Sequence, residues 1–496
     1  MSTTTAHDAT PTIETHDVKA VNAKDERGQY ASRQKIYAKR GSGYFRNIKW
    51  IVMVVTMAIY YLLPWLRWDR GPGIPGQAFL IDMEKERLYF FWFELWPQEL
   101  YLISGFLVMS ALALFLFTAI AGRVWCGYLC WQTVWTDLMI AVERFWQGDR
   151  NARIRLDKEP WSVSKFAKKL ATHLSWIAIA VATGGAFILY FGDAPTMVRD
   201  FFAGTAGFKT YLFFGLLTFF TYLMGGIARE QVCTYMCPWP RIQGAMLDQD
   251  SLFITYRDFR GEPRGPHRKN QTWEGRGDCV DCKACVAVCP MGIDIRHGPQ
   301  LECIQCALCI DACNEIMDKV GRPQNLIAYD TYRSLESEAK GGDLKLNIVR
   351  PRTIMYASLL AIVTAVVLAA TFNRTMLGLN AVAERNPLFV KLSDGSVRNT
   401  FTLKFLNKLY TTRKFSVKLE GIEGAVLTVQ GQENDTDPKV DVPPDDVRDV
   451  RVFVTVPQKA LAALPKSETV PFSFHIRDLE NGVEASRFAT LRKPAT

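Results

Sequence analysis

The spacing of eight cysteines constrains this chain more than any other feature. A run of four with the pattern C-x2-C-x2-C-x3-C occurs twice, and the second run begins 14 residues after the last cysteine of the first. The runs are Cys279, Cys282, Cys285 and Cys289, and Cys303, Cys306, Cys309 and Cys313. Three thiolates on one tight loop can bind three irons of a cubane cluster, whereas the fourth cysteine is too far along the chain to close the same cube.

We therefore predict two [4Fe–4S] clusters that exchange their fourth ligands, the spacing used by two-cluster bacterial ferredoxins. One cluster is assigned to Cys279, Cys282, Cys285 and Cys313, and the other to Cys303, Cys306, Cys309 and Cys289. The alternative is a pair of zinc knuckles, but zinc favours two CxxC pairs over a triple CxxCxxC. The 12 cysteines are also confined to the middle of the chain, unlike those of a secreted disulfide scaffold.

Five apolar segments are long enough to cross a bilayer, which takes about 20 residues. They are Ile48–Leu66, Leu100–Ala121, His173–Phe191, Tyr211–Ala228 and Thr353–Phe372. Lysine and arginine are concentrated before the first segment and in the second and fourth loops. Because basic loops stay in the cytoplasm, we expect the N-terminus and the cluster cysteines there and the C-terminus in the periplasm. The chain is then a multi-pass protein of a bacterial inner membrane.

The remaining four cysteines form an internal repeat. The second and fourth spans both end in Ile-Ala, and each is followed after four residues by Cys-x-Tyr-x-Cys. The repeat supplies Cys126 and Cys130, and Cys233 and Cys237. Residues four apart share one face of a helix, so four thiols converge at the inner membrane face if the two repeats pack together. Soft thiolates favour copper(I), zinc or an iron–sulfur centre, and Met236 and Met246 could add thioethers. The alternative is that these cysteines are buried packing residues.

Other candidate residues point less clearly to a chemical role. His173 is the single histidine in the spans, so a bis-histidine haem is not expected there. Asp137 and Glu143 follow the first cysteine pair, and we predict that they lie on the solvated face of an interfacial helix, with a proton relay as the alternative. The chain has no P-loop and no G-x-G-x-x-G after a strand, so its electrons should come from a protein partner or from quinol. The net charge of +9 serves membrane topology, and no nucleic-acid partner is expected.

After the fifth span, short alternating segments predict an all-β immunoglobulin-like sandwich without a disulfide. The candidate strands are Thr400–Phe405, Phe415–Glu420, Ala425–Gln430, Val447–Val456 and Pro471–Leu479, with a turn at Asn481-Gly482. The full fold class is an α-helical membrane protein of five transmembrane helices, with a ferredoxin-like insert and this outer domain. The expected divisions are a disordered basic N-terminus (1–47), a membrane domain (48–250), the insert (251–350), the fifth span (351–372) and the outer domain (373–496).

In combination, these residues resemble the FixG/RdxA/CcoG family of cytochrome oxidase accessory proteins. The resemblance extends over nearly the whole chain, including the stretches Gly122–Cys130 and Cys233–Pro238, the insert and the outer domain. One departure is Trp131, where the family usually has a proline, as Pro238 is in the other repeat. The resemblance implies maturation of a cbb-type haem–copper oxidase, with that oxidase or its copper-delivery factors as partner. It also implies reduction of copper(II) to copper(I).

Three functions remain open from the sequence. The first is a cupric reductase in which Cys126, Cys130, Cys233 and Cys237 bind copper and are the catalytic residues. The second is an electron conduit from a cytoplasmic donor or quinol to a membrane partner. The third is a non-redox assembly scaffold whose outer domain holds the oxidase.

Overall fold

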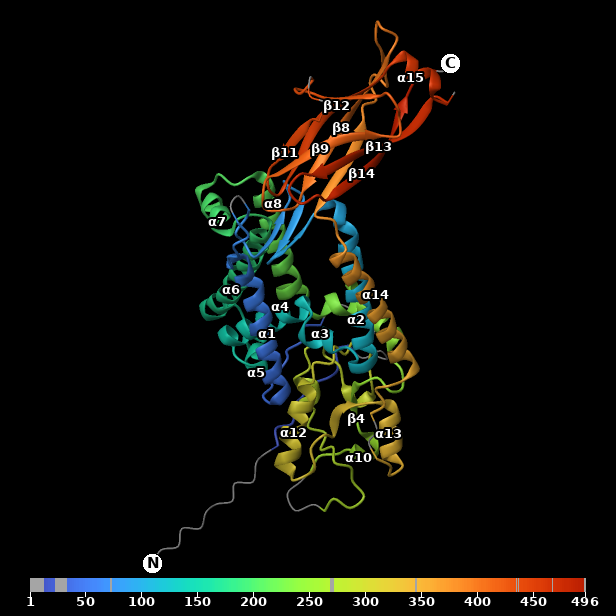
Figure 1. The fold of residues 1–496 in the computed structure, drawn as a ribbon. Helices are drawn as coiled ribbons and strands as arrows, with labels where there is room; N and C mark the ends of the chain where they lie inside the picture. Colours follow the sequence, from blue (N-terminus) through green and yellow to red (C-terminus); the bar gives the residue numbers. More distant parts are fainter. Residues whose placement is uncertain are drawn as a thin grey trace, which may run out of the picture. The chain divides into compact units, whose positions relative to one another are not determined.

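The computed structural model forms two compact units, Met1–Asp69 with Pro75–Leu368, and Arg70–Ile74 with Ala369–Thr496. It describes residues 13–22, 34–71, 74–267, 272–343, 346–433, 435, 437–465 and 467–494. The sequence predicts the membrane helices and the cysteine-rich insert as separate domains, whereas the structure joins them in the first unit. Within this unit, Figure 1 shows α7 at one end of the long helices and α12 and α13 at the other.

Five helices of the described chain are long and apolar enough to cross a membrane, the number that the sequence predicts. They contain α1 (Tyr44–Leu62), α2 (Leu100–Ala121), α6 (Val163–Ile188), α8 (Phe208–Thr221) and α14 (Pro351–Phe372). Helix α6 begins well before the predicted start at His173. The reason is a helix cap, because the Ser162 hydroxyl accepts a hydrogen bond of 3.2 Å from the backbone N–H of Lys165.

Short elements connect the spans. At the end of the long helices where α7 (Ala194–Ala203) lies, the connections include η2 (Leu63–Trp65), β1 (Phe79–Asp82), β2 (Arg87–Phe90), β3 (Phe93–Leu95), η3 (Pro97–Glu99) and η4 (Leu189–Phe191). The cysteine pairs are flanked by α3 (Val124–Tyr128), α4 (Trp131–Gln147), α5 (Arg150–Lys158), the π-helical η5 (Tyr222–Ala228) and η6 (Val232–Met236), and α9 (Trp239–Met246). Strands β1, β2 and β3 form one antiparallel sheet.

The acidic residues of α4 are buried, so the prediction that they lie on a solvated face is wrong. Glu143 is 1% exposed, and its carboxylate pairs with Lys35 at 3.0 Å, Arg153 at 3.2 Å and Arg229 at 2.9 Å. Asp137 pairs with Arg46 at 2.9 Å. Sequence periodicity could not show this, because the cations come from four different segments of the chain. The network fastens α4 to the segment that leads into Cys233.

We expect Glu143→Gln to lower the free energy of unfolding by about 3–5 kcal/mol, since it leaves two buried arginines, Arg153 and Arg229, without their carboxylate. Burial opposes ionisation of Glu143, but Arg229, Lys35 and Arg153 lower its pKa to about 2. The contribution of the Glu143 carboxylate to the free energy of unfolding is therefore complete above about pH 4.5, the pKa of an unfolded glutamate. It is lost as the pH falls toward 2. Chemical denaturation of the detergent-solubilised chain measures the effect. The control Glu159→Gln, in an exposed pair with Arg155, should change it by less than about 1 kcal/mol.

The cysteine-rich insert is built around a two-stranded antiparallel sheet and an apolar core. Strands β4 (Phe253–Tyr256) and β5 (Ile327–Asp330) pair with each other, and the cysteine runs lie between them in the sequence. The helices of the insert are α10 (Asp258–Gly261), α11 (Ala284–Ala287), η7 (Ile295–His297), α12 (Leu308–Val320) and α13 (Tyr332–Ala339). Buried Ile, Val and Met side chains surround Cys285 and Cys306, so the insert has a core of its own.

Part of the N-terminal segment is ordered against this insert, in contrast to the predicted disorder of residues 1–47. The backbone N–H of His16 donates to Cys282 O at 3.0 Å, and that of Val21 donates to Gly292 O at 2.8 Å. Ile13 and Val18 pack against the apolar core of the insert. Backbone groups of the cysteine loop thus find partners that are distant in sequence, which composition could not reveal. Residues 1–12 and 23–33 lie outside the described residues.

The second unit is the predicted two-sheet sandwich. Its strands are β6 (Leu377–Ala383), β7 (Val390–Lys391), β8 (Val397–Asn407), β9 (Arg413–Glu420), β10 (Val426–Val429), β11 (Lys439–Val442), β12 (Asp446–Val456), β13 (Thr469–Asp478) and β14 (Glu484–Arg492), with α15 (Gln458–Ala463). One sheet has the order β10-β12-β8-β6, with β7 beside β8, and the other has the order β11-β9-β13-β14. Alternate residues of β8, including Phe401, Leu403 and Phe405, fill the core between the sheets.

Candidate iron–sulfur sites and paired cysteines

The two cysteine runs fold into loops with matching backbone conformations. In the first loop Asp281 and Lys283 have positive φ angles of 51° and 57°, and in the second Gln305 and Ala307 have 55° and 62°. These residues occupy equivalent places between the cysteines of each run. Residues other than glycine rarely adopt this conformation, and backbone N–H groups so arranged form concave sites for anions. The Gln305 N–H already donates to Cys303 Sγ at 3.4 Å. Both loops therefore suit a negatively charged cluster.

The structure brings the cysteines together in two sets, each with three cysteines of one run and the fourth of the other. Cys279, Cys282, Cys285 and Cys313 line one small cavity. Cys289, Cys303, Cys306 and Cys309 line a second, which Cys285 also borders. Burial, and then the thiols of Cys282 and Cys279, raise the pKa of Cys313 to about 12. Burial also raises the pKa of Cys289 to about 11, with Cys306 as the next cause. Each fourth cysteine thus faces the other run, and binding of iron would have to displace its proton.

The paired membrane cysteines do not share one regular helix, in contrast to the predicted geometry. Cys126 lies within α3, while Cys130 follows it in extended conformation, with φ −61° and ψ 126°. Cys233 lies in the π-helical η6, and Cys237 is extended with φ −79° and ψ 119°. Each pair therefore has one cysteine in a helical turn and one just after it. The equivalent conformations support the internal repeat inferred from the sequence.

A sharp turn precedes each pair at the same position of the repeat. Gly122 ends α2 with φ 66° and ψ −134°, and Arg229 ends η5 with φ 48° and ψ −117°. This conformation is easy for glycine and strained for arginine. Arg229 is held in place by its ion pair with Glu143 and by a hydrogen bond of 2.7 Å from Nε to Gly226 O. The first repeat thus uses glycine where the second uses a buried ion pair.

The four membrane cysteines lie near one another. Burial, and then the nearby thiols of Cys130, Cys126 and Cys237, raise the pKa of Cys233 to about 12. Burial likewise raises the pKa of Cys126 to about 12, with Cys130 as the next cause. A fifth residue that the sequence analysis missed belongs to this group. The thiol of Cys126 donates to Oε1 of the fully buried Gln243 at 3.1 Å.

Other residues singled out by the sequence lie elsewhere. Met236 is 62% exposed, so it is not part of the buried group. His173 Nδ1 lies 2.9 Å from the Tyr222 hydroxyl, so the imidazole ring has a hydrogen-bond partner within the protein. Within the described residues, no three Cys, His, Asp or Glu side chains stand close enough to hold a single metal ion. Ligands of a four-iron cluster bind different irons, so they need not satisfy that criterion.

The first membrane pair is in direct contact with the loop that carries Cys303, Cys306 and Cys309. The Tyr128 hydroxyl donates to Cys306 O at 3.2 Å, and the backbone N–H of Arg123 donates to Gln305 Oε1 at 2.6 Å. A Cβ atom on Gly127 would stand 2.8 Å from Ile304 O and 3.0 Å from the Cys306 Cα, so only glycine permits this approach. Cys126 and Cys233 both pack against the core of the insert.

Family models match three parts of the chain. A model described as a 4Fe-4S dicluster domain matches residues 228–332, and one described as a 4Fe-4S binding domain matches residues 103–147. The IG-like fold at the C-terminal of FixG matches residues 367–494. The chain is therefore an iron–sulfur electron-transfer protein with a C-terminal Ig-like domain. The residues present fit such clusters, since two sets of four cysteines line small cavities beside loops with positive φ angles.

Three curated proteins are similar over nearly their whole length. The nitrogen fixation protein FixG of Rhizobium meliloti (strain 1021) is 49% identical, over 90% of this chain and 91% of its own. Protein RdxB of Cereibacter sphaeroides is 46% identical over 91% of this chain and 95% of its own, and protein RdxA of the same organism is 46% identical over 86% and 91%. The chain therefore belongs to the FixG/RdxA family.

Proposed function

We propose that this protein passes electrons from two [4Fe–4S] clusters to copper(II) bound at Cys126, Cys130, Cys233 and Cys237. The copper(I) formed would serve assembly of a cbb-type haem–copper oxidase. Each cluster, when bound, supplies one electron at a time. The ligand sets are those predicted from the sequence. The two cavities, each lined by three cysteines of one run and the fourth of the other, support them.

The contact between α3 and the second cysteine loop carries this proposal. Gly127 and Tyr128 lie between Cys126 and Cys130, and both touch the backbone around Cys306. Electrons leaving the Cys303 loop therefore have a short packed path to the first membrane pair. The set that includes Cys303 is accordingly assigned as the site nearer to the copper, and the set that includes Cys279 as the more distant one.

The chemistry of the paired thiols favours copper reduction. Thiolates stabilise copper(I) relative to copper(II), so binding at these cysteines makes the ion easier to reduce. Copper(I) also accepts a low coordination number, so one pair of thiolates is enough to hold it. Gln243 holds the Cys126 thiol in position through its Oε1 atom.

We expect the pre-reduced protein to convert about two copper(II) ions per chain, one for each one-electron cluster. The purified chain is reduced without oxygen, freed of reductant, and mixed with copper(II) and a copper(I) chelator. Absorbance of the chelate and loss of the reduced-cluster EPR signal are followed together. Reoxidation of the clusters without any copper(I) would leave the protein as an electron conduit with another acceptor.

A second candidate for the four membrane cysteines is a third [4Fe–4S] cluster. The family model described as a 4Fe-4S binding domain covers Cys126 and Cys130, and no three of the membrane thiols stand close enough to hold one ion within the described residues. Iron analysis distinguishes a copper site from a third cluster at these cysteines. We expect about eight irons and eight acid-labile sulfides per chain for two clusters, whereas about twelve of each would favour the third cluster.

The basic loops lead us to propose that the insert is cytoplasmic and the Ig-like domain periplasmic. An alkaline phosphatase fused after Thr496 should then be active, and one fused near Gly341 should be inactive. Green fluorescent protein at the same two positions should give the opposite pattern and serves as the matched control. A reversed pattern would place the cysteines on the oxidising side of the membrane and contradict the proposed chemistry.

A further inference from the structure

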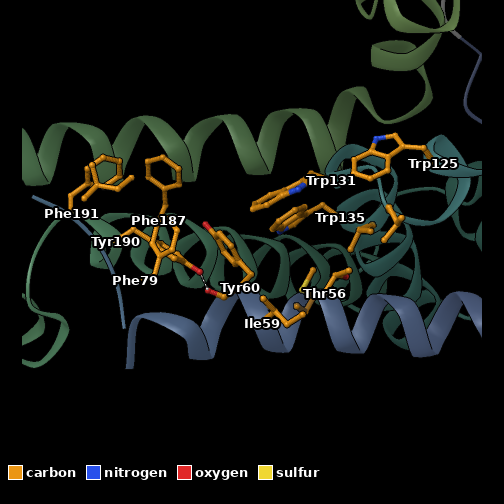
Figure 2. Close-up of a pocket in the computed structure, with 14 residues that line it drawn as sticks. Thr56, Ile59, Tyr60, Phe79, Trp125, Trp131, Trp135, Phe187, Tyr190 and Phe191 are labelled. Atoms are coloured by element: carbon orange, nitrogen blue, oxygen red, sulfur yellow. Dashed lines mark hydrogen bonds between the residues drawn. The ribbon is translucent and has the colours of Figure 1, made fainter. Parts of the chain in front are cut away.

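One cavity of the first unit lies among its membrane helices. It has a volume of about 450 Å³, within the range of small-molecule sites, and 14 residues line it. Eight of these residues are aromatic, and they come from α1, α3, α4, the end of α6 with η4, and β1. Figure 2 shows them in a row from Trp125 at one end, past Trp131, Trp135 and Tyr60, to Phe191 at the other.

The shape of the lining suits a flat ring. The indoles of Trp131 and Trp135 stack at 5.0 Å with an interplanar angle of 23°. The Tyr60 ring meets Trp131 edge-on at 4.9 Å. The exposed face of Trp131 favours another aromatic or quinonoid ring through offset stacking, in addition to the area that is buried. The row of apolar side chains beyond Tyr60 leaves room for an attached hydrocarbon tail.

Two polar groups in this lining, the indole N–H groups of Trp125 and Trp131, are left for a ligand. Most of the other polar groups are satisfied: Trp135 Nε1 donates to Thr183 Oγ1 at 2.9 Å, and the Tyr60 and Tyr190 hydroxyls donate to backbone carbonyls at 2.8 Å. Trp131 is 55% exposed, and its indole N–H has no acceptor among the residues that the structure describes. A donor without an acceptor is costly in an apolar setting. A ring carbonyl could accept this hydrogen bond, whereas a lipid acyl chain could not.

The cavity also borders the paired cysteines. Leu129 and Trp131 line it, and they are the chain neighbours of Cys130. Trp125, at the end of the row, precedes Cys126. We propose that this pocket binds the head group of a membrane quinone, with a ring carbonyl accepting the Trp131 indole N–H and the isoprenoid tail lying along the aromatic row. A redox-active lipid is thereby held beside the cysteines, which goes beyond copper reduction.

The test is binding of decylubiquinone to the full chain in detergent, with an azido-quinone analogue to map the site by mass spectrometry. One quinone should bind per chain, with labelling confined to residues that line the pocket. Ile59→Trp fills the cavity from α1 and should weaken binding at least about tenfold. Ile51→Trp is the matched control, because Ile51 lies on the same helix, is 63% exposed and does not line the pocket. This variant should bind decylubiquinone as the unchanged protein does.

Trp131→Phe keeps the ring but removes the N–H, and should weaken binding about fivefold, while Trp161→Phe, outside the pocket, should not. Unchanged iron content shows that each variant is folded. If the Ile59→Trp variant binds decylubiquinone like the unchanged chain, or if labelling spreads over all the spans, the pocket takes lipid acyl chains only and the proposal is overturned. The measurement uses neither copper nor electron transfer, so its failure would leave the proposed function standing, and failure of copper reduction would leave the quinone site standing.

Discussion

Cys289→Ala should remove the same cluster as Cys309→Ala, and Cys313→Ala the same cluster as Cys285→Ala. Each variant should lose about half of the eight irons and retain one EPR signal. The reason is the exchange of fourth ligands, because Cys289 lines the cavity of the second run and Cys313 that of the first. Alanine is used because serine can replace a thiolate as a cluster ligand.

The EPR spectra of the four cysteine variants, compared with one another, test the exchange of ligands directly. If each run held its own cluster, Cys289→Ala would instead match Cys285→Ala, and the assignment of ligands would be wrong. Val286→Ala is the matched control, since it lies in the same loop and points a buried apolar side chain into the core rather than a ligand. It should keep both signals. Each cysteine variant retains the EPR signal of one cluster, so the reduction potential of that cluster can be measured separately.

A larger effect on function is expected from the second membrane pair. Replacing Cys233 and Cys237 together with serine should leave both clusters in place and slow copper(II) reduction by the pre-reduced protein at least about tenfold. The physical reason is the loss of two of the four soft ligands that favour copper(I), while the ferredoxin insert keeps its own cysteines. Stopped-flow formation of the copper(I) chelate measures the rate, and equilibrium dialysis measures copper(I) binding.

Met236→Leu is the control for this double replacement. It changes a sulfur-containing side chain between the two cysteines, but that side chain is exposed, so the rate should stay the same. Unchanged copper binding and reduction in the double serine variant would reject the copper site. Loss of about four irons in that variant, with two clusters remaining in the insert, would instead identify these cysteines as ligands of a third cluster.

Much of the architecture follows from local patterns in the sequence. The five spans are visible because a bilayer demands long apolar runs, and their number agrees with the structure. The sandwich is visible from alternation, although the pattern does not predict β6, β7, β11 and β14; β7 and β11 are short, and β14 has an exposed polar face. The proposed cluster ligands follow from cysteine spacing, since three thiolates on a tight loop and one distant partner can reach the four irons of a cubane.

The tertiary structure alone decided how separate segments combine. Burial of Asp137 and Glu143 depends on cations from the N-terminal segment, α1, α5 and the residue after η5, and no periodicity in α4 indicates such partners. Gln243 joins the membrane cysteines from a helix that carries no motif. The aromatic pocket collects side chains from distant helices. Spacing along the chain determines which ligands a loop can offer, because covalent geometry limits their reach. Which surfaces meet is decided by packing between segments, and that information is spread over the whole sequence.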